Sequence, residues 1–192
     1  MGMAHPHPLH GVHVAILVDN GFEQIELVRP RDALLAAGAT TAIVSPQGRK
    51  VWGWDGDAKA TAFHVDVPIA EAKPTAFDAL LLPGGVRSAD RLRIDNKSVL
   101  FVHAMQIAQK PIAAICHAPW ILIETDFVRG RKLTSWPSLR TDLANAGADW
   151  LNRAVVADDL LVTSRKPADI SRFNDAMIDL FGSPNRSVAT AS

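Results

Sequence analysis

Short runs of apolar and β-branched residues recur along the chain and predict the strands of a buried sheet. Several of these runs end in turn-forming residues, such as Asp19-Asn20-Gly21. Short apolar runs bounded by turn signals are typical of strands that are covered on both faces. The predicted strands are residues 12–18, 40–45, 77–82, 111–115 and 160–163.

Apolar residues with helical spacing fill most of the segments between these strands. The first predicted helix ends at Gly38, and Pro30 is expected to kink or split it. The predicted helices are residues 23–38, 100–107, 120–123, 139–146 and 168–181. Because strands and helices alternate along the whole chain, we expect a mostly parallel sheet with helices on both faces.

One domain accounts for the whole pattern. Residues 12–181 are expected to form it, with a hairpin-like excursion at residues 49–67. Residues 1–11 and 182–192 are rich in Pro, Ser, His and Asn and are expected to be flexible tails. A chain of 192 residues buries roughly 70% of its extended-state surface, so it needs no disulfide or metal to hold a core.

Composition narrows the possible functions. The 20 basic and 20 acidic residues give a net charge of zero, so the chain lacks the basic surface of a nucleic-acid binder. No apolar run approaches the roughly 18 residues of a membrane span. Residues 1–11 also lack the apolar core of a secretory signal, so we expect a cytoplasmic protein. There is no phosphate loop or dinucleotide fingerprint, and we expect no cofactor.

Histidines near the N-terminus do not change this expectation. His5, His7, His10 and His13 invite a metal interpretation, but three of them lie in the predicted tail and His13 lies in a strand. We therefore predict no metal site.

Cys116, the only cysteine, follows the strand 111–115 and carries the strongest chemical signal. Ala114 and Ala118 stand two places on either side of it, the pattern of a nucleophile elbow, where small residues avoid clashes in a tight strand-to-helix turn. A helix N-terminus beyond the turn would favour a thiolate, so the thiol is expected to titrate well below about 8.5. The alternative is a buried cysteine that packs as a small apolar residue.

Two other strand ends carry candidate site residues. Gly84 and Gly85 follow the strand 77–82 and either expose backbone N–H groups to an oxyanion or form an ordinary tight turn. Glu23 follows the first strand and either reaches the sulfur of Cys116 or acts as a first-turn acid of a helix. Ligands of open α/β sheets bind beyond the carboxyl ends of the strands, so we expect these residues to meet there.

Together these motifs resemble the DJ-1/PfpI superfamily, and within it the PfpI-like (protease I) branch. The resemblance covers residues 12–181 and implies a flavodoxin-like three-layer sandwich of the class I glutamine-amidotransferase type. The segments that carry it are residues 19–24, 82–85, 114–119, 134–138, 145–148 and 162–167.

The resemblance also implies roles for individual residues. Cys116 would be the nucleophile and His117 its acid/base partner, while Glu23 would be a protonated carboxyl in contact with the sulfur. Gly84, Gly85 and the amide of His117 would form the oxyanion hole. Trp136 would form a wall of the site, at a position where the family often carries tyrosine.

One implied residue departs from the family pattern. In PfpI-like members a glutamate from a neighbouring subunit orients the histidine, and Asp90 aligns with it here. Aspartate is one methylene shorter, and a misplacement near 1 Å can cost about a hundredfold in rate. A shared site requires at least a homodimer.

Two function classes follow from these residues. In the first, a stress-protective cysteine hydrolase attacks an electrophilic carbonyl of a peptide, of a glycated group or of a small aldehyde, as protease I, deglycases and glyoxalase III do. In the second, Cys116 is a stress sensor that is oxidised to sulfenate or sulfinate, or the protein is a chaperone. Because the chain has one cysteine, this oxidation cannot end in an internal disulfide.

Overall fold

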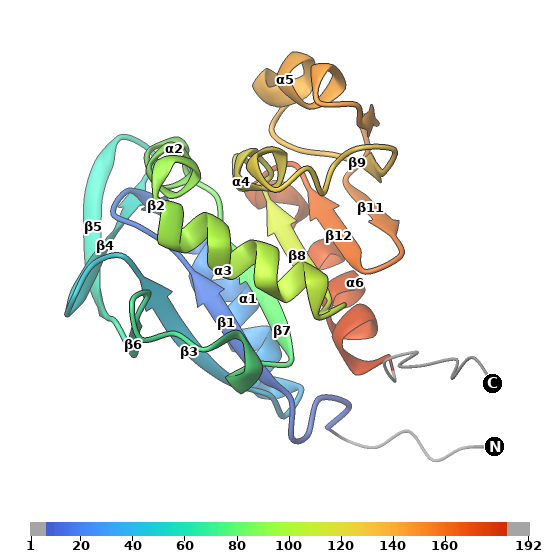
Figure 1. Cartoon of the computed structure of the whole chain (residues 1–192). Coiled ribbons are helices and arrows are strands. Elements are labelled where there is room, and N and C mark those ends of the chain that lie inside the picture. Colours follow the sequence, from blue (N-terminus) through green and yellow to red (C-terminus); the bar gives the residue numbers. More distant parts are fainter. Residues whose placement is uncertain (1–6, 184–192) are drawn as a thin grey trace, which may run out of the picture.

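A seven-stranded sheet forms the centre of the molecule in the computed structural model, which describes residues 7–183 (Figure 1). Six of its strands run parallel and one edge strand, β11, is antiparallel. The strands in spatial order are β11 (Val155–Asp158), β12 (Leu161–Ser164), β8 (Ile112–Ile115), β7 (Ala79–Leu82), β1 (His13–Leu17), β3 (Thr40–Ser45) and β6 (Val67–Pro68).

Helices cover both faces of this sheet (Figure 1). On one face α1 (Gln24–Ala36) and α6 (Ile170–Gly182) pack on a core that includes Ile16 and Leu81. On the other, α2 (Val86–Ile94), α3 (Asn96–Ile107) and α4 (Trp120–Glu124) pack on a core that includes Leu17 and Leu80. Neighbouring residues of one strand thus enter opposite cores, as the pleat of a strand requires.

The order β3-β1-β7-β8-β12 is the 2-1-3-4-5 order of flavodoxin-like folds, as the resemblance to the DJ-1/PfpI superfamily implies. In such a sheet the strand order reverses beside β1, and ligands bind in the crevice beyond β1 and its neighbour β7. A ligand site is therefore expected at the loops that follow β1 and β7.

Smaller elements complete the structure. The predicted hairpin is formed by β4 (Lys50–Asp55) and β5 (Ala58–His64), and β4 also pairs with β2 (Phe22–Glu23) directly after the first strand. Beyond β8 lie the paired strands β9 (Lys132–Leu133) and β10 (Asp149–Trp150), with α5 (Arg140–Asn145) between them. Three-residue 3-10 turns occur at Pro74–Ala76, Pro137–Leu139 and Pro167–Asp169.

Two sequence predictions about this frame need correction. Of the two predicted effects of Pro30, the split does not occur, because α1 is one helix around this buried proline. The lost backbone hydrogen bond costs about 3 kcal/mol, and the burial of Leu27 and Leu34 offsets it. Leu9, within the predicted tail, is fully buried and donates its backbone N–H to the carbonyl of Ala37, so the packed region begins before Val12.

Of the predicted tails, residues 1–6 and 184–192 lie outside the described residues. Among the helices that are described, none is both long and apolar enough to cross a membrane.

Candidate active site

The loops after β1, β7 and β8 meet at the carboxyl edge of the sheet and enclose a cavity of about 220 Å³. The cavity is the predicted meeting point of the three strand ends. Its lining residues are Glu23, Glu26, Gly85, Cys116, His117, Trp136 and Pro167.

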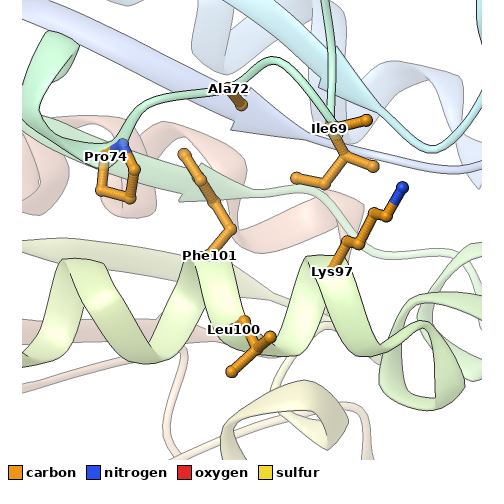
Figure 2. Close-up of a pocket in the computed structure, with 7 residues that line it drawn as sticks. Ile69, Ala72, Pro74, Lys97, Leu100 and Phe101 are labelled. Carbon is orange, nitrogen blue, oxygen red and sulfur yellow. The ribbon is translucent and has the colours of Figure 1, made fainter.

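A second cavity, of about 290 Å³, is larger but offers no comparable chemistry (Figure 2). It lies between α3 and the segment after β6, and its lining is apolar apart from the exposed Lys97. Besides this lysine, that lining contains no side chain that can act as a nucleophile or as an acid/base group, so we assign the active site to the smaller cavity.

Cys116 has the backbone of a strained elbow. Its φ is +63°, in the left-handed region that residues other than glycine rarely adopt. Two hydrogen bonds hold it there: its N–H donates to the carbonyl of Ser164 at 3.0 Å, and its carbonyl accepts from the N–H of Trp136 at 2.8 Å. The predicted elbow is thus present, and strain of this kind is typical of functional residues.

Glu26, and not Glu23, is the carboxyl beside the sulfur. Glu26 is fully buried, and its Oε2 accepts the backbone N–H of Gly84 at 3.1 Å. A Cβ placed on Gly84 would lie 2.4 Å from this oxygen and 2.5 Å from the Cβ of Cys116, so the two side chains meet where Gly84 leaves room. Glu23 takes part in the pairing of β2 with β4, so α1 begins one residue later and turns Glu26 toward Cys116.

Burial keeps Glu26 protonated at neutral pH. It raises the pKa of the Glu26 carboxyl to about 8, and the nearby charge of Glu23 adds to the increase. Oε1 of Glu26 has no hydrogen-bond partner among the described residues. A protonated carboxyl can donate its O–H to a sulfur or oxygen placed beside it, which an ionised one cannot.

This protonation gives a stability prediction for Glu26→Gln. Between the ordinary pKa of 4.5 and about 8, the folded chain holds a proton that the unfolded chain releases, so stability falls as pH rises through this window. The integrated loss is on the order of 5 kcal/mol. Glutamine mimics the protonated carboxyl, so the variant should match the wild type near pH 5 and exceed it by several kcal/mol near pH 8.

Urea unfolding of both proteins at pH 5 and pH 8 measures this difference. The exposed Glu71→Gln is the matched control and should show no comparable pH-dependent gain. A Glu26→Gln effect that is the same at both pH values would show that Glu26 is ionised throughout.

Gly84 and Gly85 have different roles, which corrects the predicted oxyanion hole. The N–H of Gly84 is already bonded to Glu26, so it is not a free donor. The N–H groups of Gly85 and His117 point at the sulfur and lower the pKa of the Cys116 thiol. These two N–H groups therefore form the anion-binding side of the cavity.

Burial nevertheless raises the pKa of the Cys116 thiol, and an ionised Glu26 raises it further. This direction is opposite to the low pKa predicted from a helix N-terminus. The reason is local: α4 begins only at Trp120, four residues after Cys116, and has five residues. A helix dipole therefore does not lower this pKa, which leaves a neighbouring base as the other route to a thiolate.

His117 is placed to be that base. Its Nδ1 lies 3.2 Å from the sulfur of Cys116, and its Nε2 lies 3.5 Å from the hydroxyl oxygen of Ser138. Burial lowers the pKa of His117 to about 4, so the ring is neutral at pH 7 and can accept the thiol proton. Trp136 stacks on the ring at 5.8 Å between centroids, and Trp120 packs at 5.5 Å, so the ring orientation is fixed.

Two residues of this arrangement were not among the sequence candidates. Ser138 has no sequence signal beyond its place two residues after Trp136. Glu26 has one: it shares a helix face with Pro30 and Leu34, at i, i+4 and i+8, and all three are buried. A carboxylate on an apolar face of this kind is the signal that identifies it.

Asp90 is exposed on α2 and does not belong to the described residues that line the cavity. Within one chain it therefore takes no part in the site. Trp136, by contrast, lines the cavity as predicted and is 38% exposed.

Comparison with known proteins agrees with this architecture. A model of the DJ-1/PfpI family matches residues 12–180. Protein/nucleic acid deglycase 2 of Escherichia coli (strain K12) is 43% identical over 171 residues, which cover 88% of this chain and 97% of that protein. An uncharacterized protein of Staphylococcus saprophyticus is 44% identical over 169 residues, or 86% of this chain and 95% of the relative.

Solved structures show the same fold. A two-domain protein of Anabaena variabilis, with DJ-1/ThiJ/PfpI-like and ferritin-like domains, superposes with a TM-score of 0.82 at 33% identity. The match covers 94% of this chain but 52% of that one, so this chain spans about half of the two-domain protein. DJ-1beta of Drosophila melanogaster superposes with a TM-score of 0.79 at 26% identity, over 90% of this chain and 91% of that one.

Proposed function

The chain belongs to the DJ-1/PfpI family, and we propose that it is a cytoplasmic, cysteine-dependent deglycase that removes small carbonyl adducts from amino groups. The observation that carries the proposal is the strained Cys116, with Nδ1 of His117 3.2 Å from its sulfur, inside the cavity of about 220 Å³.

The size of the cavity favours a small adduct over a peptide. Pockets for drug-sized ligands usually measure about 300–1,000 Å³, so this cavity accepts a group of only a few heavy atoms. A methylglyoxal adduct brings three carbons to the nucleophile, whereas a protease must also hold residues beside the cleaved bond. The similarity to a deglycase over nearly the full length of both chains supports the same choice.

The reaction can be written on the residues of the cavity. Sulfur bonds to the carbon that carries the amine, and His117 takes the thiol proton. The carbon–nitrogen bond breaks, and the nitrogen receives that proton and leaves as the amine. The remaining thiohemiacetal transfers the hydrogen of this carbon to the neighbouring carbonyl carbon through an enediol, giving a thioester. Water then releases a hydroxy acid and restores the thiol.

This sequence needs no external oxidant, because one carbon is oxidised while its neighbour is reduced. Negative charge develops on the carbonyl oxygen as the enediol forms. The N–H groups of Gly85 and His117 converge on this region and stabilise that oxygen.

The test measures release of the amine from a preformed adduct of methylglyoxal with Nα-acetyl-lysine. We expect amine and lactate to appear together, faster than the adduct dissociates spontaneously. If amine release keeps its spontaneous rate while free methylglyoxal is consumed, the enzyme acts on the aldehyde and the deglycase proposal fails.

The unpaired Oε1 of Glu26 supports oxidative sensing as a second function. One peroxide converts the thiolate to sulfenate with loss of water, and a second gives sulfinate. A sulfinate oxygen beside Glu26 would accept its O–H.

Asp90 distinguishes these two functions, provided that the protein is a homo-oligomer in which Asp90 of one copy faces His117 of another. In that assembly Asp90→Ala should abolish turnover and leave peroxide oxidation of Cys116 intact. Light scattering should show a dimer or larger species. The exposed Asp175→Ala on α6 is the control. A strict monomer at micromolar concentration, or full turnover by Asp90→Ala, would exclude the shared site.

A further inference from the structure

The carboxyl group of Glu23 lines the cavity but has no part in the chemistry at sulfur. Glu26 takes the position beside Cys116 that the sequence assigned to Glu23. Glu23 lies instead at the N-terminal end of α1. It is half-buried and lines the same cavity as Cys116 and Trp136. Partial desolvation disfavours the charge of a carboxylate. We therefore expect a carboxylate in a reaction cavity to have a function there that offsets this cost.

The hairpin holds Glu23 in place. Glu23 is in register with Trp54 through the pairing of β2 and β4, and its Oε2 accepts the N–H of Gly56 at 3.3 Å. In the described part of the chain Oε1 has no such hydrogen bond and remains able to bind a ligand. The carboxyl is therefore oriented before any ligand arrives, which lowers the entropic cost of binding.

The charge of the cavity has one sign. Glu23 and Glu26 are its two carboxyls, and the described lining contains no lysine or arginine. The guanidinium of Arg87, which follows the Gly85 loop, is stacked over Trp54 at 5.5 Å. With Glu26 protonated, Glu23 remains as the negative group that a substrate meets.

Burial raises the pKa of Glu23, with a further increase from Asp55, while the Gly56 N–H opposes both. A cation bound beside the carboxylate would favour its charged form and remove this cost. The exposed indole of Trp136 offers a second favourable surface to a cation. Both features suit a positively charged group and oppose an anionic one.

We infer that Glu23 selects the leaving group, so that the enzyme prefers adducts on amines and guanidinium groups to adducts on thiols. This inference rests on the proposed deglycase function and names its substrate class. The adduct nitrogen takes up a proton and becomes positively charged before the carbon–nitrogen bond breaks, and the Glu23 carboxylate stabilises that charge through a charge-assisted hydrogen bond. A departing thiol gains no positive charge and draws no benefit from Glu23.

The experiment compares three preformed methylglyoxal adducts, on Nα-acetyl-lysine, Nα-acetyl-arginine and N-acetylcysteine, with wild type and Glu23→Gln. The glutamine keeps the size of the side chain but removes its charge. We expect kcat/KM for the two nitrogen adducts to fall by about tenfold to a hundredfold, the range for a hydrogen bond to a charged group. For the thiol adduct, kcat/KM should change less than about threefold. This retained turnover would also show that the Glu23→Gln variant is folded.

Asp55→Asn is the matched control, because Asp55 follows Trp54, the partner of Glu23 in the pairing of β2 with β4, but does not line this cavity. It should leave all three rates within about twofold of wild type. An equal loss for nitrogen and sulfur adducts in Glu23→Gln, or no loss for any, would overturn the selection by Glu23. Failure of wild type to accelerate any adduct would instead overturn the proposed function itself.

Discussion

Replacing Cys116 with serine is expected to lower adduct turnover by roughly 10³-fold or more. Serine keeps the size and the elbow backbone, but its hydroxyl is a far weaker nucleophile than a thiol beside a neutral histidine. The loss should appear in kcat, because the cavity that binds the adduct is unchanged. Steady-state release of amine from the lysine adduct measures it.

Controls at Cys116 separate chemistry from folding. Cys116→Ala should lose turnover to the same extent, since neither variant has a thiol. Both should keep the wild-type free energy of unfolding in urea within about 1 kcal/mol, because Cys116 is packed at an exposed fraction of 6% and the changes are small. Turnover within tenfold of wild type in either variant would remove Cys116 from the mechanism.

Gly85→Ala is expected to destabilise the fold by about 3–5 kcal/mol and to abolish turnover. Gly85 has a φ of +96°, and an added Cβ would lie 2.5 Å from the backbone N of Glu23 and 2.6 Å from the carbonyl oxygen of Gly21. Both are backbone atoms and cannot move away without shifting the loop after β1. That loop positions Glu23, and the N–H of Gly85 faces the sulfur, so stability and turnover should fall together.

Gly130→Ala is the matched control for this substitution. Gly130 also has a positive φ, of +73°, but an added Cβ would meet nothing within 4 Å. It should cost only the backbone strain, about 1–2 kcal/mol, with turnover unchanged. Urea unfolding of the two variants gives the comparison. Equal destabilisation of the two variants would mean that backbone strain alone, and not the close approach of the backbone atoms around Gly85, disfavours a side chain at residue 85.

The sheet was predictable because its strands are buried on both faces. A strand such as Ala79–Leu82 has no polar residue to interrupt its apolar run, so it is visible without knowledge of its neighbours. Strand β11 was not predicted, because Val155–Asp158 pairs on one side only and its apolar run is short. Helix α2 was also missed, since arginines and Asp90 alternate there with few apolar residues.

The elbow at Cys116 was predictable for a similar reason, because its pattern is local. The choice between Glu23 and Glu26 was not, because it depends on where α1 begins. Pairing of Phe22 and Glu23 with the hairpin fixes that start, and the hairpin lies some thirty residues later in the chain. A tertiary contact thus decides which carboxyl faces the sulfur.

The central claim is that the sulfur of Cys116 bonds to the adduct before the amine leaves. The most direct measurement is a rapid acid quench of wild-type enzyme mixed with the lysine adduct, followed by mass spectrometry of its peptides. The account predicts a three-carbon unit on the Cys116 peptide that rises as amine is released and disappears as lactate forms. Amine release at the wild-type rate with Cys116 unmodified at every time point, and undiminished in Cys116→Ser, would contradict it.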